Sequence, residues 1–136
     1  MSARSKARQR ALEILFEADV RDVPAPDVLK RRVETSSPPL NPYATTLIEG
    51  VGAHLERIDE LLATYAVGWT LDRMPAVDRN ILRIGAFELL WAADVPDGVA
   101  ISESVALARE LSTDESPTYV NGLLSRLQQL KPSLTL

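Results

Sequence analysis

Basic side chains crowd the first ten residues of the chain, where Arg4, Lys6, Arg8 and Arg10 occur without an acidic residue. The remaining 126 residues hold 11 basic and 19 acidic side chains, a net charge of −8. Guanidinium and ammonium groups donate charge-assisted hydrogen bonds to phosphates. A basic arm on an acidic body indicates a polyanionic partner, although a solubilising terminus would share this composition.

The pattern of the first predicted helix favours the polyanion interpretation. Its apolar stripe, continued toward the N-terminus, meets Arg4 and Arg8. Because arginine is rarely buried, the first one or two turns are expected to project beyond the body and expose guanidinium groups. The stripe consists of Ala7, Ala11, Ile14, Leu15 and Ala18.

The residue types that catalyse reactions are scarce. The chain has no cysteine and one histidine, His54, which argues against thiolate catalysis, histidine triads and metal sites. It also lacks a glycine-rich phosphate loop and a GxSxG motif. Asp114 and Glu115 precede a predicted helix, where negative charge is stabilised by the helix dipole, and this explanation is favoured over paired-carboxylate catalysis. The sequence predicts a protein that is not an enzyme and needs no cofactor.

The stretch from Trp69 to Trp91 predicts the element that positions the others. From Pro75 onward its apolar residues cover every side of a helix. A helix that is apolar all round is buried in a domain or a membrane, and the charges at Asp78 and Arg83 exclude the membrane. We therefore expect a central helix.

Charges on this helix need partners. Arg79 and Arg83 lie four residues apart and repel unless acids or an external anion lie nearby. Asp72, Asp78 and Glu88 are the internal candidates. Glu88 lies within an apolar face, where an unpaired carboxylate is costly. A buried ion pair between Glu88 and one of the arginines is predicted.

The whole chain, residues 1–136, is predicted to be one all-α domain of about seven helices around the central helix. Residues 36–42 predict a loop, and the apolar pattern from Tyr43 to Tyr65 predicts a bend or two helices meeting near Arg57. Asp27 and Ser102 are expected to cap helices, and Gly122 to allow two helices to approach closely. No apolar run nears 18 residues and no leader is recognisable, so a cytoplasmic protein without a membrane contact is expected.

Several segments together resemble the NusB family of bacterial transcription antitermination factors. They read PAVDRNILRIGAFELL, DVP, VAISESVALARELST and DESPTYVNGLL in order. The resemblance implies an all-helical fold of two packed three-helix groups and no catalysis. It also implies binding of the single-stranded boxA element of ribosomal RNA leaders, together with the ribosomal protein NusE, in an antitermination complex with RNA polymerase.

The resemblance assigns roles to particular residues. The arginine-rich start of the family falls on Arg4, Lys6, Arg8 and Arg10 as RNA contacts, which gives a salt-dependence slope of magnitude about 3 if about four charges are used. Tyr119 falls on an aromatic position that would stack on a base, although a core role is nearly as well supported by sequence. The remaining assignments are Asp114 and Glu115 to a loop that moderates RNA affinity, and Asp72, Arg73 and Asp78 to the protein partner. Arg79 is a further RNA-binding candidate from its own charge, since its pairing with Arg83 would suit an external anion.

Two functions stay open at this point. One is the free-standing antitermination factor; the other is the NusB-like helical domain attached to ribosomal RNA cytosine methyltransferases. The second needs a separate catalytic domain, and the sequence ends at Leu136. The sequence also leaves monomer and homodimer open.

Overall fold

The structure is a computed structural model that describes residues 2–35 and 39–136. These residues form seven α-helices and one short 3₁₀ helix, without a strand in the described part. The all-α prediction is confirmed. The helices are α1 Ala3–Arg21, α2 Ala25–Thr35, α3 Pro42–Ala53, α4 Leu55–Tyr65, α5 Ala76–Trp91, α6 Asp97–Leu111 and α7 Ser116–Leu130, followed by η1 Lys131–Ser133.

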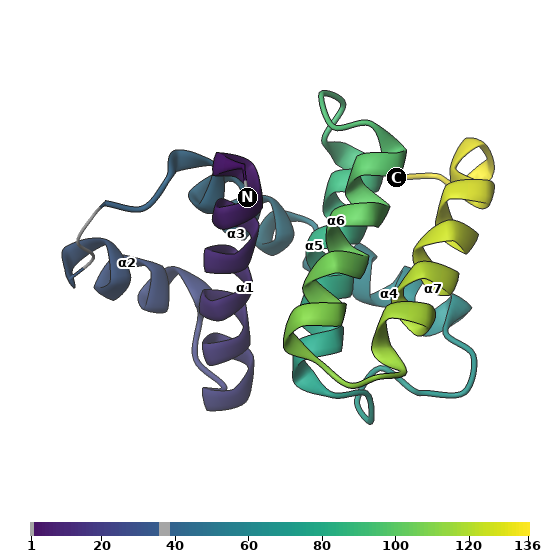
Figure 1. Cartoon of the computed structure of the whole chain (residues 1–136), viewed down its shortest axis with the longest axis horizontal. Helices are drawn as coiled ribbons and strands as arrows, with labels where there is room; N and C mark the ends of the chain where they lie inside the picture. The colour runs from purple at the N-terminus through teal and green to yellow at the C-terminus, as the bar shows by residue number, and fades with distance from the viewer. Residues whose placement is uncertain (1, 36–38) are drawn as a thin grey trace.

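The helices gather into two groups that meet at α5 (Figure 1). One group consists of α1, α2 and α3, which pack against one another. In the other, α5, α6 and α7 pack mutually and α4 lies against α5 and α7. Since α5 also packs against α1 and α3, it joins the two groups. Within the described ranges, no helix combines the length and apolar character needed to cross a membrane.

Burial confirms α5 as the central helix. Eleven of its 16 residues are buried, and they include the acidic Asp78 and Glu88 as well as Asn80. The apolar residues Ile81, Leu82, Ile84 and Leu89 come from different sides of the helix, and all are 1% exposed or less. A helix buried on every side must satisfy its polar groups within the protein.

Local sequence signals set the start of α3 and the break between α3 and α4. Asn41 caps α3 by accepting a hydrogen bond from the Tyr43 amide at 2.8 Å, and Pro42 follows at the first helical position. The predicted break in the long apolar pattern is confirmed, but it falls at His54 rather than near Arg57. His54 stacks on Trp91 with a centroid separation of 4.3 Å, so it is a packed histidine.

Other local predictions are wrong or lie outside the described residues. Ser102 lies inside α6, which begins at Asp97 because Pro96 precedes it, and α2 begins at Ala25, before Asp27. The loop predicted over 36–42 is irregular from 39 to 41, while 36–38 lie outside the described residues. Gly122 is exposed, and a Cβ there would meet nothing within 4 Å.

Two other glycines provide the close approaches. A Cβ on Gly85 would lie 2.5 Å from Ser104 Oγ and 2.7 Å from Leu124 Cδ1, so α5 contacts α6 and α7 through its backbone there. A Cβ on Gly50 would overlap the ring of Phe87. The tight packing around α5 therefore depends on glycines in α3 and α5.

Gly85→Ala should lower the free energy of unfolding by about 1–3 kcal/mol, because an added methyl overpacks the contact of α5 with its neighbours. Gly122→Ala is the matched control and should raise stability by up to about 1 kcal/mol, since alanine favours an exposed helix interior. Urea denaturation of both variants tests this difference, and equal effects would contradict the assigned packing.

Candidate nucleic-acid interface

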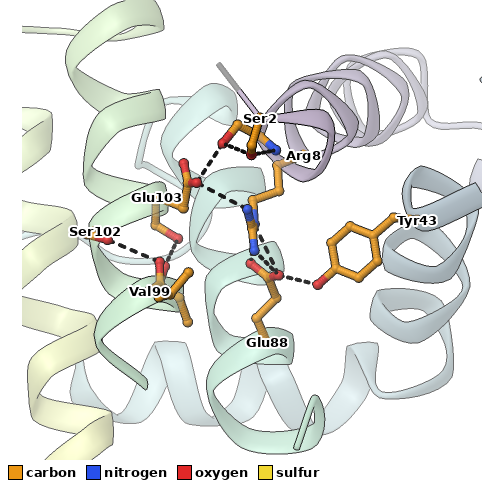
Figure 2. A network of polar contacts seen from close by, with 10 residues as sticks. Ser2, Arg8, Tyr43, Glu88, Val99, Ser102 and Glu103 are labelled. Carbon is orange, nitrogen blue, oxygen red and sulfur yellow. Dashed lines mark hydrogen bonds and ion pairs between the residues drawn. The ribbon is translucent and has the colours of Figure 1, made fainter. Parts of the chain in front are cut away.

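Arg8 does not project from the body but enters it. The residue is 3% exposed, and its guanidinium meets the fully buried carboxylate of Glu88 (Figure 2). Arg8 Nε donates to Glu88 Oε1 at 2.8 Å and Nη2 donates to Oε2 at 2.9 Å, a two-pronged ion pair. The predicted buried pair of Glu88 is confirmed, but its arginine comes from α1 rather than from α5.

Neighbouring polar groups complete this network. The hydroxyl of Tyr43 in α3 donates to Glu88, and Arg8 Nη1 donates to Glu103 of α6 at 3.3 Å. Ser5 in the first turns of α1 also donates to Glu103, at 2.6 Å. Burial disfavours the charged guanidinium, but the hydrogen bonds and charge of Glu88 outweigh it and raise the pKa of Arg8. The network joins α1, α3, α5 and α6.

The expectation that the first two turns expose their guanidinium groups is therefore wrong at Arg8, whereas Arg4 in the first turn is exposed as expected. Arg8 continues the apolar stripe of α1 because its guanidinium pairs with the buried carboxylate of Glu88. This partner lies 80 residues away in the sequence, so helical periodicity does not reveal it. Arg8 is a structural residue, and the exposed cations of the predicted RNA-binding set are Arg4, Lys6 and Arg10. Met1 of the predicted arm lies outside the described residues.

Arg79 and Arg83 form a second cluster with acids that the sequence did not single out. Arg79 contacts Asp19 at 2.8 Å, and Arg83 donates to Asp59 through two nitrogens, each at 2.9 Å. Although partial burial raises the pKa of Asp19, its hydrogen bonds from Arg79 and Asn80 outweigh this and lower it. Arg79 is 16% exposed in its side chain and also donates to backbone carbonyls, so it adds little cationic surface for RNA.

Asp78 is buried rather than facing a partner. It is 0% exposed and accepts hydrogen bonds from Ser112 and from Ser116, the latter at 2.7 Å. These serines lie at the end of α6 and the start of α7. The expected partner contact at Asp78 is wrong for this chain, because the carboxylate instead anchors the connection between those helices.

The other expected partner residues, Asp72 and Arg73, are exposed in the turn before α5. The hydrogen bond from the Thr70 side chain is the largest cause that lowers the pKa of Asp72, so its carboxylate is charged at neutral pH. The acidic pair Asp114 and Glu115 is also exposed, beside the start of α7. These four side chains are accessible, as their predicted roles require.

Tyr119 is half-buried and packs against Trp69, with ring centroids 4.8 Å apart. Its hydroxyl lies 3.4 Å from the Trp69 carbonyl oxygen. Both rings line an open groove of about 520 Å³ that Asp114 and Glu115 also border. Tyr119 therefore packs on a neighbouring ring and also lines an open groove, while its stacking on an RNA base stays a prediction.

The start of α1 and the start of α7 lie near opposite ends of α6 (Figure 1). Arg4 contacts Asp94, just before α6, whereas Tyr119 follows soon after the helix ends. Between them a groove along α6 and α7 presents Ser102, Arg109 and Asn121, and Thr118 lines this groove and the aromatic groove alike. A ligand that reaches both ends must follow the 15 residues of α6, about 22 Å.

The sequence did not single out Trp69 or Arg109 for this surface, nor Asp94 and Tyr43 beside the arm. A tryptophan at the start of the central stretch was a visible signal for an aromatic surface. The contact of Asp94 with Arg4 joins residues 90 positions apart and left no local signal.

These features define a class: an all-helical protein whose surface offers cations near one end of an open groove and aromatic rings near the other. This surface suits a single-stranded nucleic acid, whose phosphates bind cations and whose bases stack on rings.

The NusB family model matches residues 5–129. The transcription antitermination protein NusB of Thermobifida fusca is 65% identical over 134 residues, covering 98% of this chain and 94% of the relative. That of Arthrobacter sp. strain FB24 is 63% identical and covers 98% of both chains. The chain belongs to the NusB family of transcription antitermination proteins.

Solved structures agree with this membership. NusB of T. maritima superposes with a TM-score of 0.83 at 30% identity, covering 98% of this chain and 99% of that one. A crystal structure of the antitermination factors NusB and NusE in complex with dsRNA has a TM-score of 0.83 at 27% identity and covers 95% and 98%. The relatives' names identify transcription factors, in agreement with the prediction of a protein that is not an enzyme.

Glu88→Gln should lower the free energy of unfolding by about 3 kcal/mol, because it leaves the buried Arg8 without its main counter-charge. Glu13→Gln removes the carboxylate of an exposed pair with Arg10 and should change stability by less than about 0.5 kcal/mol. Urea unfolding measures both variants. A loss below about 0.5 kcal/mol for Glu88→Gln would show that the buried pair does not stabilise the fold.

Stability should also fall at alkaline pH because of Tyr43. Burial, followed by its hydrogen bond to Glu88, raises the pKa of Tyr43 above its ordinary value of 10.0. The resulting stabilisation is fully present below about pH 10 and is lost as pH rises through the folded-state pKa. Unfolding free energies measured from about pH 8.5 to 11 should decline more steeply for the wild type than for Tyr43→Phe, and parallel curves would contradict this assignment.

Proposed function

We propose that this protein is a transcription antitermination factor that binds boxA-type single-stranded RNA of ribosomal RNA leaders together with the ribosomal protein NusE, and acts on RNA polymerase. Membership of the NusB family supports this function. The observation that carries the RNA-binding step is the open groove of mixed polar and apolar lining along α6 and α7, with exposed cations beyond one end and the Trp69–Tyr119 pair at the other.

The RNA follows α6 in this proposal. Arg4, Lys6 and Arg10 hold phosphates at the start of α1, and a base stacks on the exposed part of Tyr119. Arg109, exposed in the groove between them, offers a further guanidinium to the backbone. Asp114 and Glu115 border the aromatic end, where their negative charge lowers RNA affinity.

The protein partner approaches at the turn before α5 in this proposal. Asp72 and Arg73 are exposed there, and Asp72 lines an open groove of about 620 Å³ together with Trp69 and Leu71. Exposed charges of both signs beside apolar groups suit a polar protein interface. This surface lies near the aromatic pair through Trp69, so the partner and the RNA bind side by side.

The matched relatives favour the free-standing factor over the methyltransferase domain, since those named antitermination proteins are covered over 94% and 98% of their own length. This function places the protein with RNA polymerase in the bacterial cytoplasm.

Deleting residues 1–10 would remove Arg8 and with it the buried network, so side-chain replacement is the sharper test of the arm. The triple variant Arg4→Ala, Lys6→Ala, Arg10→Ala should weaken binding of a labelled boxA RNA at least about tenfold at low salt, because three phosphate contacts are lost. The wild-type slope of log affinity against log salt should have a contribution of about 2 from these three cations, below the 3 expected for four.

The matched control is Lys30→Ala, Arg31→Ala, Arg32→Ala in α2, which removes the same charge from the helix far from the groove (Figure 1). It should weaken RNA binding only slightly. Fluorescence titrations with single-stranded and double-stranded boxA RNA, each with and without NusE, measure both variants. Equal losses for the two triples would reject the arm as the RNA site.

A further inference from the structure

Arg4 is engaged by two groups of its own protein. Its Nη2 donates to Asp94 Oδ2 at 2.9 Å, and its guanidinium carbon lies 4.2 Å from the centroid of the Tyr43 ring. The side chains of Arg4 and Asp94 are 46% and 67% exposed, so a ligand can reach both. The Tyr43 ring contacts the Arg4 guanidinium from one side by a cation–π interaction, while Asp94 accepts a hydrogen bond from one of the guanidinium N–H groups.

Asp94 occupies one N–H donor of the Arg4 guanidinium, a group that also suits an RNA phosphate. Carboxylates and phosphates both accept the planar donors of a guanidinium. The hydrogen bond from Arg4 is also the largest cause that lowers the pKa of Asp94, so this carboxylate is charged at neutral pH.

The other exposed cations of the arm differ from Arg4. Arg10 pairs with Glu13 within its own helix, at 3.2 Å. Lys6 makes no ion pair among the residues that the structure describes. Arg4 alone among the three is tied to a different part of the chain, the loop between α5 and α6.

We propose that Asp94 sets the affinity of this protein for RNA by competing with a backbone phosphate for Arg4. This proposal rests on the proposed function. An RNA phosphate that takes this donor of Arg4 displaces Asp94, which then returns to water near a polyanion. The displacement of Asp94 and its repulsion by the RNA both weaken binding. Because Asp94 competes for the same donor, the contact between Arg4 and the RNA is easily reversible.

Asp94→Asn tests the competition, because it keeps the size of the side chain and removes its charge. A labelled single-stranded boxA RNA should bind this variant about two- to fivefold more tightly than the wild type, the range expected for an exposed ion pair. The magnitude of the salt slope should rise by up to about 0.7, since Arg4 no longer exchanges one anion for another. In the Arg4→Ala background, Asp94→Asn should tighten binding less than it does when Arg4 is present, because only the repulsion between the Asp94 carboxylate and the RNA is then removed.

Asp97→Asn is the matched control for general charge removal. It neutralises a carboxylate three positions away that pairs with Lys131 instead of the arm. Its effect on RNA affinity should be the same whether residue 4 is arginine or alanine. Thermal unfolding of each variant verifies that the fold is retained.

The outcomes separate this inference from the proposed function. If Arg4→Ala weakens RNA binding but Asp94→Asn does not strengthen it, or strengthens it equally without Arg4, the competition is refuted while the arm remains the RNA site. If the triple arm variant binds RNA as the wild type does, both proposals fail. Tighter binding that requires Arg4 supports the competition.

Discussion

The ion pair between Arg8 and Glu88 is the interaction on which the arrangement of the two helix groups depends. Arg8 belongs to the α1 to α3 group, and Glu88 lies in the central helix of the other. Burying two charges is costly unless each is fully hydrogen-bonded. Tyr43 and Glu103 supply the remaining bonds, so four helices must be in place before the pair is satisfied. The pair therefore favours one relative placement of the helix groups over other apolar packings.

Much of the fold could be predicted because helical periodicity and capping are local. The apolar positions of α5 identify a buried helix from its own residues, and Asn41 with Pro42 marks the start of α3 within two positions. The charge contrast between the first ten residues and the rest likewise needs no structure. The glycines were harder, because a close approach depends on what lies opposite: Phe87 faces Gly50, whereas Gly122 faces solvent.

The site was predicted less well because its pairings are long-range. The need of Glu88 for a cation follows from its apolar surroundings, but the choice of Arg8 over Arg79 or Arg83 depends on how α1 packs. Asp78 shows the same limit: its exposure could not be deduced from its place near a helix start, and Ser112 and Ser116 enclose it. Patterns along one helix identify which polar groups need partners, and the tertiary structure determines which residues those partners are.

The start of α1 supplies side chains to the core and to the surface, and this fixes the helical register of those residues. Arg8 must enter the buried network, while Arg4, Lys6 and Arg10 face outward from the same turns. Inserting one residue between Lys6 and Arg8 would rotate the preceding cations by about 100° around the helix. Total positive charge would be unchanged, yet the surface it occupies would move. A basic N-terminal segment with the same composition but another residue order would therefore not replace this one, because the order decides which side of the helix the cations occupy.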